Sequence, residues 1–424
     1  MLKYLYQRAI RYSHSVHVKL GAAVATNLRI LVSGASIAGP AAAYWLTRAG
    51  NDVTVIERAD AVRTAGQNID VRGTGREVLR QMNLEAAVLA RNTGEIGTSF
   101  VDDSGTPICR FPAATEDDDG LTAEVEILRG ELAELVIKTV SDDVDFRFGQ
   151  QIVGINDEGD GAQVTFSDQS TETFDLVVIA EGTSSRTRQM VFGDVPKRQL
   201  GLYTAYGTIP RQDDDNRWWN WYNAPGGRSI TVRPDNKGTT RVALSFLSSP
   251  RGYEREPMDR QKKIIRDVFH GVGWRAPQIL DLLDATDELY VDYLTQIFAP
   301  EYSRGSTVLL GDAAWCATPL SGVGTTLALT GAYVLAGELA WAPTVAGGLR
   351  GYQEQMRGFV EAAQSIPPGG PRLAHPKTVA GVKVLRTALR VLGSRPVRKL
   401  GGALPTPSTK AKDLPRYPEL EAMP

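Results

Sequence analysis

The feature that most constrains the fold is a glycine-rich turn between two apolar segments near the amino terminus. Residues 34–40 read Gly-Ala-Ser-Ile-Ala-Gly-Pro. The apolar run Leu28–Val32 before this turn predicts a strand, and the small and apolar residues of Pro40–Ala49 predict a tightly packed helix. A second apolar run, Asp52–Ile56, predicts another strand. Strand, glycine turn, helix and strand together indicate a βαβ unit.

The chemistry of this turn favours a dinucleotide. Gly34 permits a tight turn and Gly39 permits close packing of helix on strand, while the helix start offers backbone N–H groups to a diphosphate. Glu57 follows Gly34 by 23 residues and ends the next strand, where a carboxylate can accept hydrogen bonds from ribose hydroxyls. Ser36 replaces the usual middle glycine. An acid at position 57 favours FAD or NAD; the alternative is a glycine-rich turn without a ligand.

A second constellation lies far along the chain and favours FAD. The predicted strand Thr307–Leu310 leads into Gly311 and Asp312, whose carboxylate could reach ribityl hydroxyls. The segment Pro319-Leu-Ser-Gly322-Val-Gly-Thr-Thr then opens an apolar helix, whose N–H groups and dipole would stabilise negative charge on a reduced flavin. The alternative interpretation is an ordinary helix start with an Asp cap.

Three separated motifs resemble the class A flavoprotein monooxygenases, the family of para-hydroxybenzoate hydroxylase. They are the first turn with Glu57 and Arg58, the segment from Asp175 to Arg186 that contains Glu181-Gly182, and the segment from Gly311 to Gly324. Arg129-Gly-Glu-Leu132 also matches an Arg-x-x-Leu helix whose arginine contacts the flavin in the family. The resemblance implies FAD contacts from fifteen residues: Gly34, Ser36, Ile37, Ala38, Gly39, Glu57, Arg58, Arg129, Gly311, Asp312, Pro319, Gly322, Val323, Gly324 and Thr325.

The chain departs from the family pattern at three positions and matches a subgroup at another. Glu181 stands where the family usually has Asp, Trp315 where it often has His, and Thr326 where it often has Asn. The loop Gly66–Gly73 resembles a loop over the flavin in the tetracycline-inactivating members. That likeness implies that Gln67 and Arg72 lie near the flavin and the substrate entrance; otherwise they are ordinary loop residues.

We predict an α/β fold with a discontinuous Rossmann-like FAD-binding domain, an inserted antiparallel-sheet substrate domain and a C-terminal helical segment. The expected helices are Arg72–Leu84, Arg129–Val140, Met258–Leu283 and Gly322–Leu339, and Phe174–Ala180 is an expected buried strand. The expected division is an N-terminal extension at 1–27, FAD-binding parts at 28–100, 126–195 and 301–365, substrate-domain parts at 101–125 and 196–300, and a helix and tail at 366–424.

Two C-terminal segments carry separate expectations. Thr378–Leu392 is a basic amphipathic helix with Lys383, Arg386 and Arg390 on one face. Docking against its own protein is the favoured interpretation, and a membrane surface or partner is the alternative. Pro405–Pro424 is rich in proline and is expected to be irregular.

The predicted second sheet, between Leu202 and Leu247, supplies aromatic side chains for a dry substrate pocket. Alternation along strands sends some of them to the pocket and the rest into packing against helices. The aromatic residues of this region are Tyr203, Tyr206, Trp218, Trp219, Trp221, Tyr222 and Phe246. We select Tyr206, Trp219 and Trp221, with Gln67 and Arg72, as pocket candidates. A planar hydrophobic substrate, such as a phenol or polyketide-like aromatic, is expected, and no catalytic base is assigned.

The resemblance implies a reaction as well as a fold. FAD is reduced by NADH or NADPH as a transient reductant, reacts with O2 to give a C4a-hydroperoxide, and passes one oxygen to the substrate. A halogenase, oxidase or reductase of the same fold remains an alternative, as does a non-catalytic flavin-binding module that uses the basic C-terminal helix. Trp219-Asn220-Trp221 resembles a halogenase element, but one extra residue precedes the next proline.

Composition excludes several other classes. The 47 basic and 49 acidic side chains give a net charge of −2, so we expect no nucleic-acid partner. Two cysteines and four scattered histidines predict neither a disulfide framework nor a metal site. Charged residues interrupt the N-terminal extension, so we expect no secretory signal; a poorly ordered extension outside the fold is the favoured interpretation, and mitochondrial targeting is the alternative. We expect no transmembrane span. A cytoplasmic monomer or homodimer is the resulting expectation.

Overall fold

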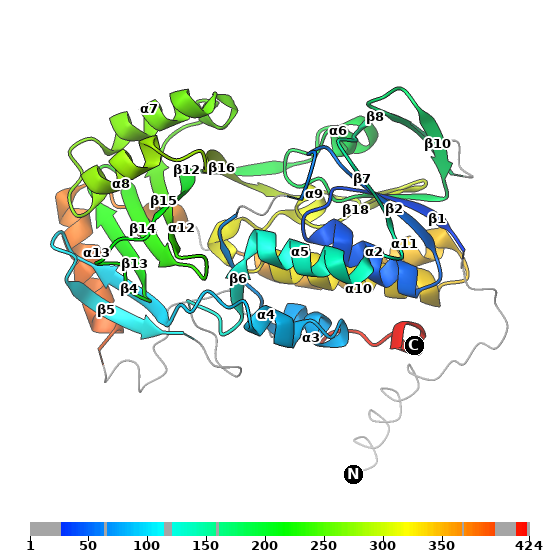
Figure 1. Ribbon diagram of the computed structural model, residues 1–424, viewed down its shortest axis with the longest axis horizontal. Coiled ribbons are helices and arrows are strands. Elements are labelled where there is room, and N and C mark those ends of the chain that lie inside the picture. The colour runs from blue at the N-terminus through cyan, green and yellow to red at the C-terminus, as the bar shows by residue number, and fades with distance from the viewer. Residues whose placement is uncertain are drawn as a thin grey trace, which may run out of the picture.

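The computed structural model describes residues 27–62, 66–113, 121–157, 161–366, 369–394 and 413–421. These residues form two lobes that lie side by side along the long axis of the molecule (Figure 1). One lobe is an α/β sandwich around a mainly parallel sheet, and the other is a mainly antiparallel sheet with helices. The N-terminal extension, up to residue 26, lies outside the described residues.

The first lobe is built on a six-stranded sheet of order β17-β18-β11-β1-β2-β7. All neighbouring pairs are parallel except β17 and β18. The inner strands β1, β2 and β11 are buried on both faces, as near-continuous apolar runs predict. Their bounds are β17 Ser303–Arg304, β18 Thr307–Leu309, β11 Leu176–Ile179, β1 Arg29–Ser33, β2 Asp52–Glu57 and β7 Asp145–Phe148.

The helices of this lobe pack around one long central helix. The helix α10 contacts α2, α3 and α11, and its residues are buried on nearly every side, which explains why it is apolar all round. Shorter helices complete the lobe. The bounds are α2 Ala38–Arg48, α3 Gly73–Gln81, α4 Glu85–Leu89, α5 Arg129–Val140, α6 Arg186–Phe192, α9 Asp312–Trp315, α10 Gly324–Trp341 and α11 Val345–Gln364.

The second lobe is built on a seven-stranded sheet of order β16-β12-β15-β14-β13-β4-β5. Its strand pairs are antiparallel except β13 with β4. Helices α7 Met258–Phe269 and α8 Ala276–Asp284 share a hydrophobic core with one face of this sheet (Figure 1). The bounds are β16 Leu289–Ile297, β12 Lys197–Pro210, β15 Thr239–Leu247, β14 Arg228–Pro234, β13 Trp219–Ala224, β4 Gly97–Val101 and β5 Pro107–Pro112.

Two small sheets complete the arrangement. Strand β3 Asn68–Asp70 pairs antiparallel with β6 Glu126–Leu128, and β6 leads directly into α5. A three-stranded sheet joins β8 Ile152–Asp157, β9 Ala162–Phe166 and β10 Thr171–Phe174. Two single turns of 3-10 helix, Tyr253–Arg255 (η1) and Pro319–Ser321 (η2), connect larger elements.

The structure corrects three expectations about elements. The expected helix Met258–Leu283 is two helices, because the chain turns at residues 270–275, where Gly271 has a φ of +70°. The expected strand Phe174–Ala180 is divided between β10 and β11, which belong to different sheets. The expected domain boundary at residue 100 cuts β4, which lies wholly in the seven-stranded sheet because it pairs with β13 and β5.

The C-terminal segments reach both lobes. After α12 Gly370–Ala374, the helix α13 Val379–Leu392 docks on β5 and β13 of the second lobe. Arg386, expected on its charged outer face, instead forms an ion pair with Asp103 at 2.9 Å. Within the expected irregular tail, residues 405–412 and 422–424 lie outside the described part, and α15 Pro418–Glu421 forms a helical turn.

The chain returns to the first lobe just before α15. The buried ring of Tyr417 lies against Gly337 of α10, where an added Cβ atom would meet the ring at 2.2 Å. Its hydroxyl donates a hydrogen bond to Glu338 Oε1 at 2.7 Å. Among the described residues, the structure has no helix that is long and apolar enough to cross a membrane.

Candidate FAD site

The turn from β1 into α2 has the geometry expected for a diphosphate. Gly34 has a φ of +111°, and a Cβ atom there would lie 2.5 Å from the carbonyl oxygen of Ala180. A Cβ on Gly39 would lie 1.8 Å from the carbonyl oxygen of Gly34, so the helix start closes onto the turn. Ser36, Ile37 and Ala38 lie between these glycines, at the open N-terminus of α2.

Glu57, at the end of β2, lies beside this turn. Its Oε2 accepts a hydrogen bond from the backbone N–H of Ala35 at 3.0 Å, and its Oε1 accepts one from Ala59 at 3.0 Å. The carboxylate is therefore fixed next to the helix start, with lone pairs left for a ribose. Arg58 is exposed and has no hydrogen bond or ion pair with another described residue.

Arg129 reaches the same turn from the start of α5. Its Nη2 and Nε donate to Ser36 Oγ at 2.9 and 3.2 Å. Gln67 lies next to it, because the backbone N–H of Arg129 donates to the carbonyl of Gln67 at 3.0 Å. A guanidinium at a helix N-terminus beside open N–H groups forms a donor set suited to a diphosphate. The structure thus brings Ser36, Gln67 and Arg129 together.

The Gly311-Asp312 turn meets the first turn from the other side. A Cβ on Gly311 would lie 3.1 Å from Cβ of Ala38, and a Cβ on Gly324 would lie 4.0 Å from Asp312 Oδ1. Asp312 is exposed, yet burial by surrounding protein raises its pKa, while Arg129 opposes that rise. We refer to the space bordered by Asp312, Arg129 and these two turns as the recess.

The loop before α10 borders this recess. Pro319 is exposed in η2, while Gly322, Gly324 and Thr325 are half-buried and Val323 is buried. Thr326 Oγ accepts a hydrogen bond from the backbone N–H of Arg72 at 3.0 Å. The structure therefore places Arg72 against the start of α10, where its side chain pairs with Asp70 at 2.8 Å.

The residues predicted to contact a flavin cofactor are thus concentrated on one recess. The recess has a glycine-lined helix start, one guanidinium, and one carboxylate at each end: Glu57 beside the diphosphate turn and Asp312 beside the loop of α10. Only glycine fits at positions 34 and 39, and the donors and acceptors match the diphosphate, ribose and ribityl groups of FAD. The residues present fit the cofactor.

The sequence matches a protein-family model described as FAD binding domain over residues 27–364. The chain belongs to this FAD-binding family. A FAD-dependent monooxygenase of Sarocladium schorii is 32% identical, over 93% of this chain and 99% of its own length. A flavin-dependent monooxygenase of a Phoma species is 34% identical, over 92% and 98%. The crystal structure of tetracycline destructase Tet(55) superposes with a TM-score of 0.76 and 29% identity, over 93% of this chain and 100% of that one.

Membership in the FAD-binding family makes FAD the cofactor, and the monooxygenase relatives make the chain a flavin-dependent monooxygenase. The resemblance found in the sequence is confirmed at this level. The contacts that individual residues make with FAD stay predictions, which the geometry above supports.

Two residues that depart from the family pattern have structural partners. Glu181 accepts four hydrogen bonds, from Ser33 Oγ, Ser185 Oγ, Thr187 Oγ1 and the Thr187 backbone N–H, at 2.6 to 3.1 Å. Its carboxylate thus fastens the turn after β11 to β1. Trp315 is 1% exposed and packs edge-on against Tyr302 in the core of the FAD-binding lobe.

Sequence reasoning missed Arg188, which ties two of the motifs together. Its guanidinium is 1% exposed and donates to the carbonyl of Thr183 at 2.7 Å and to that of Ala313 at 3.0 Å. Thr183 belongs to the second motif, and Ala313 follows the Gly311-Asp312 turn. The only signal in the sequence is its position two residues after the second motif, in a helix that otherwise looks exposed.

The aromatic candidates of the substrate lobe separate by face. Tyr203, Tyr222 and Phe246 lie in the core shared with α7 and α8. Tyr206, Trp219 and Trp221 alternate with core residues and therefore lie on the opposite face of the sheet. Trp218 precedes β13 and stacks against Arg110.

This opposite face is directed toward the FAD-binding residues. Tyr206 stacks on Tyr290 with ring centroids 5.0 Å apart. Tyr290 is 46% exposed, yet burial raises its pKa to about 12, and the nearby Arg129 opposes the rise. Burial likewise raises the pKa of Asp292, and Asp312 adds to the rise. Side chains of β12 and β16 therefore share the recess with Arg129 and Asp312.

Proposed function

We propose that the chain hydroxylates a hydrophobic aromatic or polyketide-like molecule held between FAD and the open face of the seven-stranded sheet. NADH or NADPH serves as transient reductant and O2 as oxygen source, by the hydroperoxide route that the resemblance implies. The observation that carries the proposal is the shared recess, in which Tyr206 and Tyr290 lie with Arg129 and Asp312.

Each group of residues has a task in this proposal. Gly34, Ser36 and Arg129 bind the diphosphate, and Glu57 binds the ribose. Asp312 and the loop at Gly322 orient the flavin end. Bound FAD supplies the redox and oxygen chemistry, so the protein has to position it and exclude water. Aromatic walls at Tyr206, Trp219 and Trp221 exclude water.

The division into domains stays part of this proposal. We infer that the substrate domain comprises the seven-stranded sheet with α7 and α8, and that the FAD-binding domain comprises the six-stranded sheet with its helices. The separate hydrophobic cores of the two sheets support this division.

The test measures NADH or NADPH consumption by the FAD-loaded protein in the presence of each member of a panel of aromatic compounds. Because a tetracycline destructase is among the similar structures, fused polycyclic phenols enter the panel first. We expect at least one compound to stimulate NADH or NADPH consumption and to give a product that gains one oxygen atom from labelled O2. No stimulation by any compound contradicts the proposal, and halide incorporation would identify a halogenase instead.

A matched pair of variants locates the substrate. Tyr206→Ala enlarges the proposed pocket and should raise KM or uncouple NAD(P)H consumption from product formation. Tyr203→Phe, on the helix-packed face, removes a hydroxyl that accepts hydrogen bonds from the N–H groups of Arg251 and Gly252. It should lower the melting temperature and leave KM unchanged. Equal KM values in both variants would place the substrate elsewhere.

A further inference from the structure

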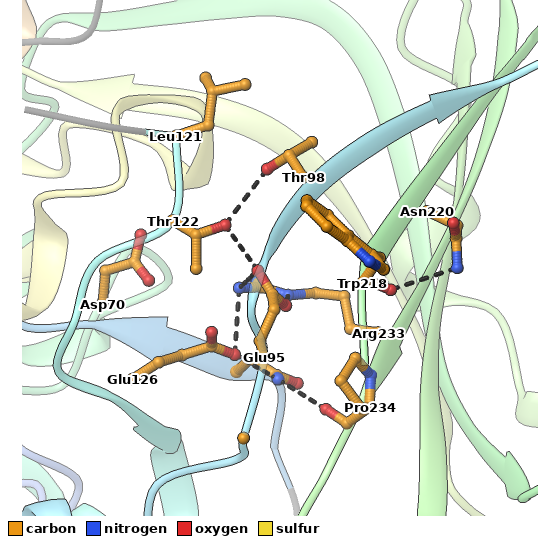
Figure 2. A network of polar contacts seen from close by, with 12 residues as sticks. Asp70, Glu95, Thr98, Leu121, Thr122, Glu126, Trp218, Asn220, Arg233 and Pro234 are labelled. Atoms are coloured by element: carbon orange, nitrogen blue, oxygen red, sulfur yellow. Dashed lines mark hydrogen bonds and ion pairs between the residues drawn. The ribbon is translucent and has the colours of Figure 1, made fainter. Parts of the chain in front are cut away.

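A network of charged side chains surrounds Arg233 where the two lobes meet (Figure 2). Arg233 comes from β14, Glu95 from the segment before β4, Glu126 from β6 and Asp70 from β3. The two glutamates are almost completely buried. Burying a charged side chain costs desolvation free energy unless the charge is paired. The contacts of these side chains therefore indicate what the network does.

Four contacts fix the guanidinium of Arg233. Its Nε donates to Glu95 Oε2 at 2.8 Å, and its Nη2 lies 3.1 Å from Glu126 Oε1 and 3.4 Å from Glu95 Oε1. The ring of Trp219 lies 4.2 Å from the guanidinium carbon and stacks on it. Thr122 holds Glu95 in turn, donating to its Oε1 at 2.7 Å.

One nitrogen of Arg233 is left over. Nη1 has no hydrogen-bond or ion-pair partner among the described residues. Unlike the unpartnered polar atoms that are fully enclosed in the protein, Nη1 is in contact with solvent. The exposed 13% of the side chain therefore includes Nη1. A guanidinium held by two of its nitrogens offers its remaining N–H groups to a ligand.

The charge of the network depends on a proton. Glu126 is 1% exposed, and its Oε2 is sealed and without a partner. Burial raises the pKa of Glu126 to about 8; Glu95 and Asp70 contribute to the rise, and Arg233 and Asn68 oppose it. Burial raises the pKa of Glu95 as well. At neutral pH the network therefore holds a proton, and Arg233 does not face two full negative charges.

The network borders the proposed substrate space. Arg233 alternates with the core residue Val232 on β14, which puts its side chain on the same sheet face as Trp219 and Trp221. Asp70, paired with Arg72, lies against the flavin loop, since a Cβ on Gly322 would be 3.8 Å from Asp70 Oδ2. A ligand on this face beside the loop meets Arg233.

We propose that Arg233 recognises an oxyanion of the aromatic substrate, a carboxylate or a phenolate, by donating hydrogen bonds from Nη1. Glu95, Trp219 and Glu126 are positioning residues that aim the guanidinium, and the proton on Glu126 preserves its attraction for an anion. This assignment rests on the proposed function, because it narrows the substrate to aromatic compounds with an acidic oxygen.

The test measures binding to oxidised, FAD-loaded protein through the change in flavin absorbance, without NAD(P)H. Two probe pairs separate the sources of the oxyanion: 2-naphthoate against 2-naphthamide for a carboxylate, and 2-naphthol against 2-methoxynaphthalene for a phenolate. We expect the wild type to bind the acidic member of at least one pair tighter by about tenfold or more, the value of one charge-assisted hydrogen bond. No preference for either acidic member overturns the proposal.

Variants assign the preference to Arg233. The double variant Arg233→Gln, Glu95→Gln leaves no unpaired charge on Glu95 and should lose the preference. Glu95→Gln alone leaves Arg233 in place and should weaken the preference less than the double variant does. The exposed Arg211→Gln is the matched control and should keep the preference. A double variant that still prefers the acidic probe overturns the proposal, and so does a control that loses the preference as completely as the double variant.

The pH dependence separates recognition from a purely structural role. In the wild type, the preference for 2-naphthoate should weaken as the pH rises above about 8, because Glu126 ionises and adds a negative charge beside Arg233. Glu126→Gln mimics the protonated side chain and should retain the preference at the higher pH. Identical pH profiles contradict the role of Glu126. These titrations need no turnover, so their result is independent of whether the panel finds a substrate.

Discussion

The FAD recess and the Arg233 network lie next to each other but are built in different ways. In the recess, the backbone determines the shape of the proposed diphosphate site, because Gly34 and Gly39 leave no space for a side chain. In the network, side chains from β3, β6, β14 and the segment before β4 meet around one guanidinium. The cofactor site can therefore be recognised from short local motifs, whereas the network joins single residues from separate segments between Asp70 and Arg233.

This difference teaches what each region can tolerate. A backbone site has one acceptable residue at its tightest points, so a single methyl group is damaging. A side-chain network tolerates substitutions that preserve its charge balance and fails when one partner is removed alone. The following changes test that distinction, from the largest expected effect to the smallest.

Gly34→Ala should have the largest effect on cofactor binding. The new Cβ would meet the Ala180 carbonyl at 2.5 Å, in a backbone conformation with φ of +111°. Strain and overlap together cost about 3 kcal/mol, so FAD affinity should fall about a hundredfold or more. Flavin absorbance per mole of purified protein measures this, with circular dichroism as a check on folding.

Gly50→Ala is the matched control for that change. Gly50 also has a positive φ, of +81°, but a Cβ there meets no atom within 4 Å. It should cost about 1 kcal/mol of stability and leave FAD occupancy unchanged. Equal FAD loss in both variants would show that backbone strain, rather than the close approach at the turn, controls binding.

Asp312→Ala should loosen FAD by about tenfold to a hundredfold, because a charged acceptor for ribityl hydroxyls is lost. Asp312 is exposed, so the protein should stay folded. Asp292→Ala removes a carboxylate that faces the same recess from β16 and should leave FAD bound. Equilibrium dialysis gives both affinities, and wild-type FAD occupancy in Asp312→Ala would refute the role assigned to this residue.

Glu126→Gln should remove the contribution of this carboxyl to the pH dependence of stability. The folded protein binds a proton at Glu126 that the unfolded chain releases above its ordinary pKa of 4.5. Wild-type stability should therefore fall relative to Glu126→Gln as the pH rises from about 4.5 to about 8, and the gap should then stay constant. Melting temperatures across this range measure it. The exposed Glu134→Gln is the control and should follow the wild type.

Glu181→Gln should have the smallest effect, about 1 kcal/mol. An amide keeps one accepting oxygen, so about half of the hydrogen bonds to Ser33, Ser185 and Thr187 survive. The melting temperature should drop by a few degrees while FAD stays bound. Loss of FAD at an unchanged melting temperature would show that Glu181 contacts the cofactor directly.

The sequence predicted the parts of the fold that depend on local pattern. The FAD family was identified from the resemblance of three motifs, whereas the α/β class, α5 at Arg129–Val140 and the first βαβ unit follow from periodicity and glycine spacing. The break between α7 and α8 was not predicted, because the apolar residues on both sides of Gly271 continue a helical pattern. Likewise β13 pairs with β4 across more than a hundred residues, and no local signal announces that pairing.

The candidate site shows the same limit. The aromatic residues of the second sheet could be recognised as a group, but only the register of β12 and β13 decides which face Tyr206 and Trp219 occupy. Arg188 and Arg233 were not identified, because arginine is usually a surface residue and its buried partners are distant in sequence. Such residues become visible only when strands from different parts of the chain are aligned.

The packing of the Tyr417 ring against Gly337 has a practical consequence for work on this enzyme. A chain shortened before Tyr417 would expose an aromatic-sized hollow on the helix whose first turn carries Gly324 and Thr325. Assays with dyes that bind hydrophobic surface would then give a signal from apolar surface that Tyr417 covers in the intact enzyme. Affinity handles are therefore better attached to the amino-terminal end, and C-terminal proteolysis during purification should be monitored by mass spectrometry.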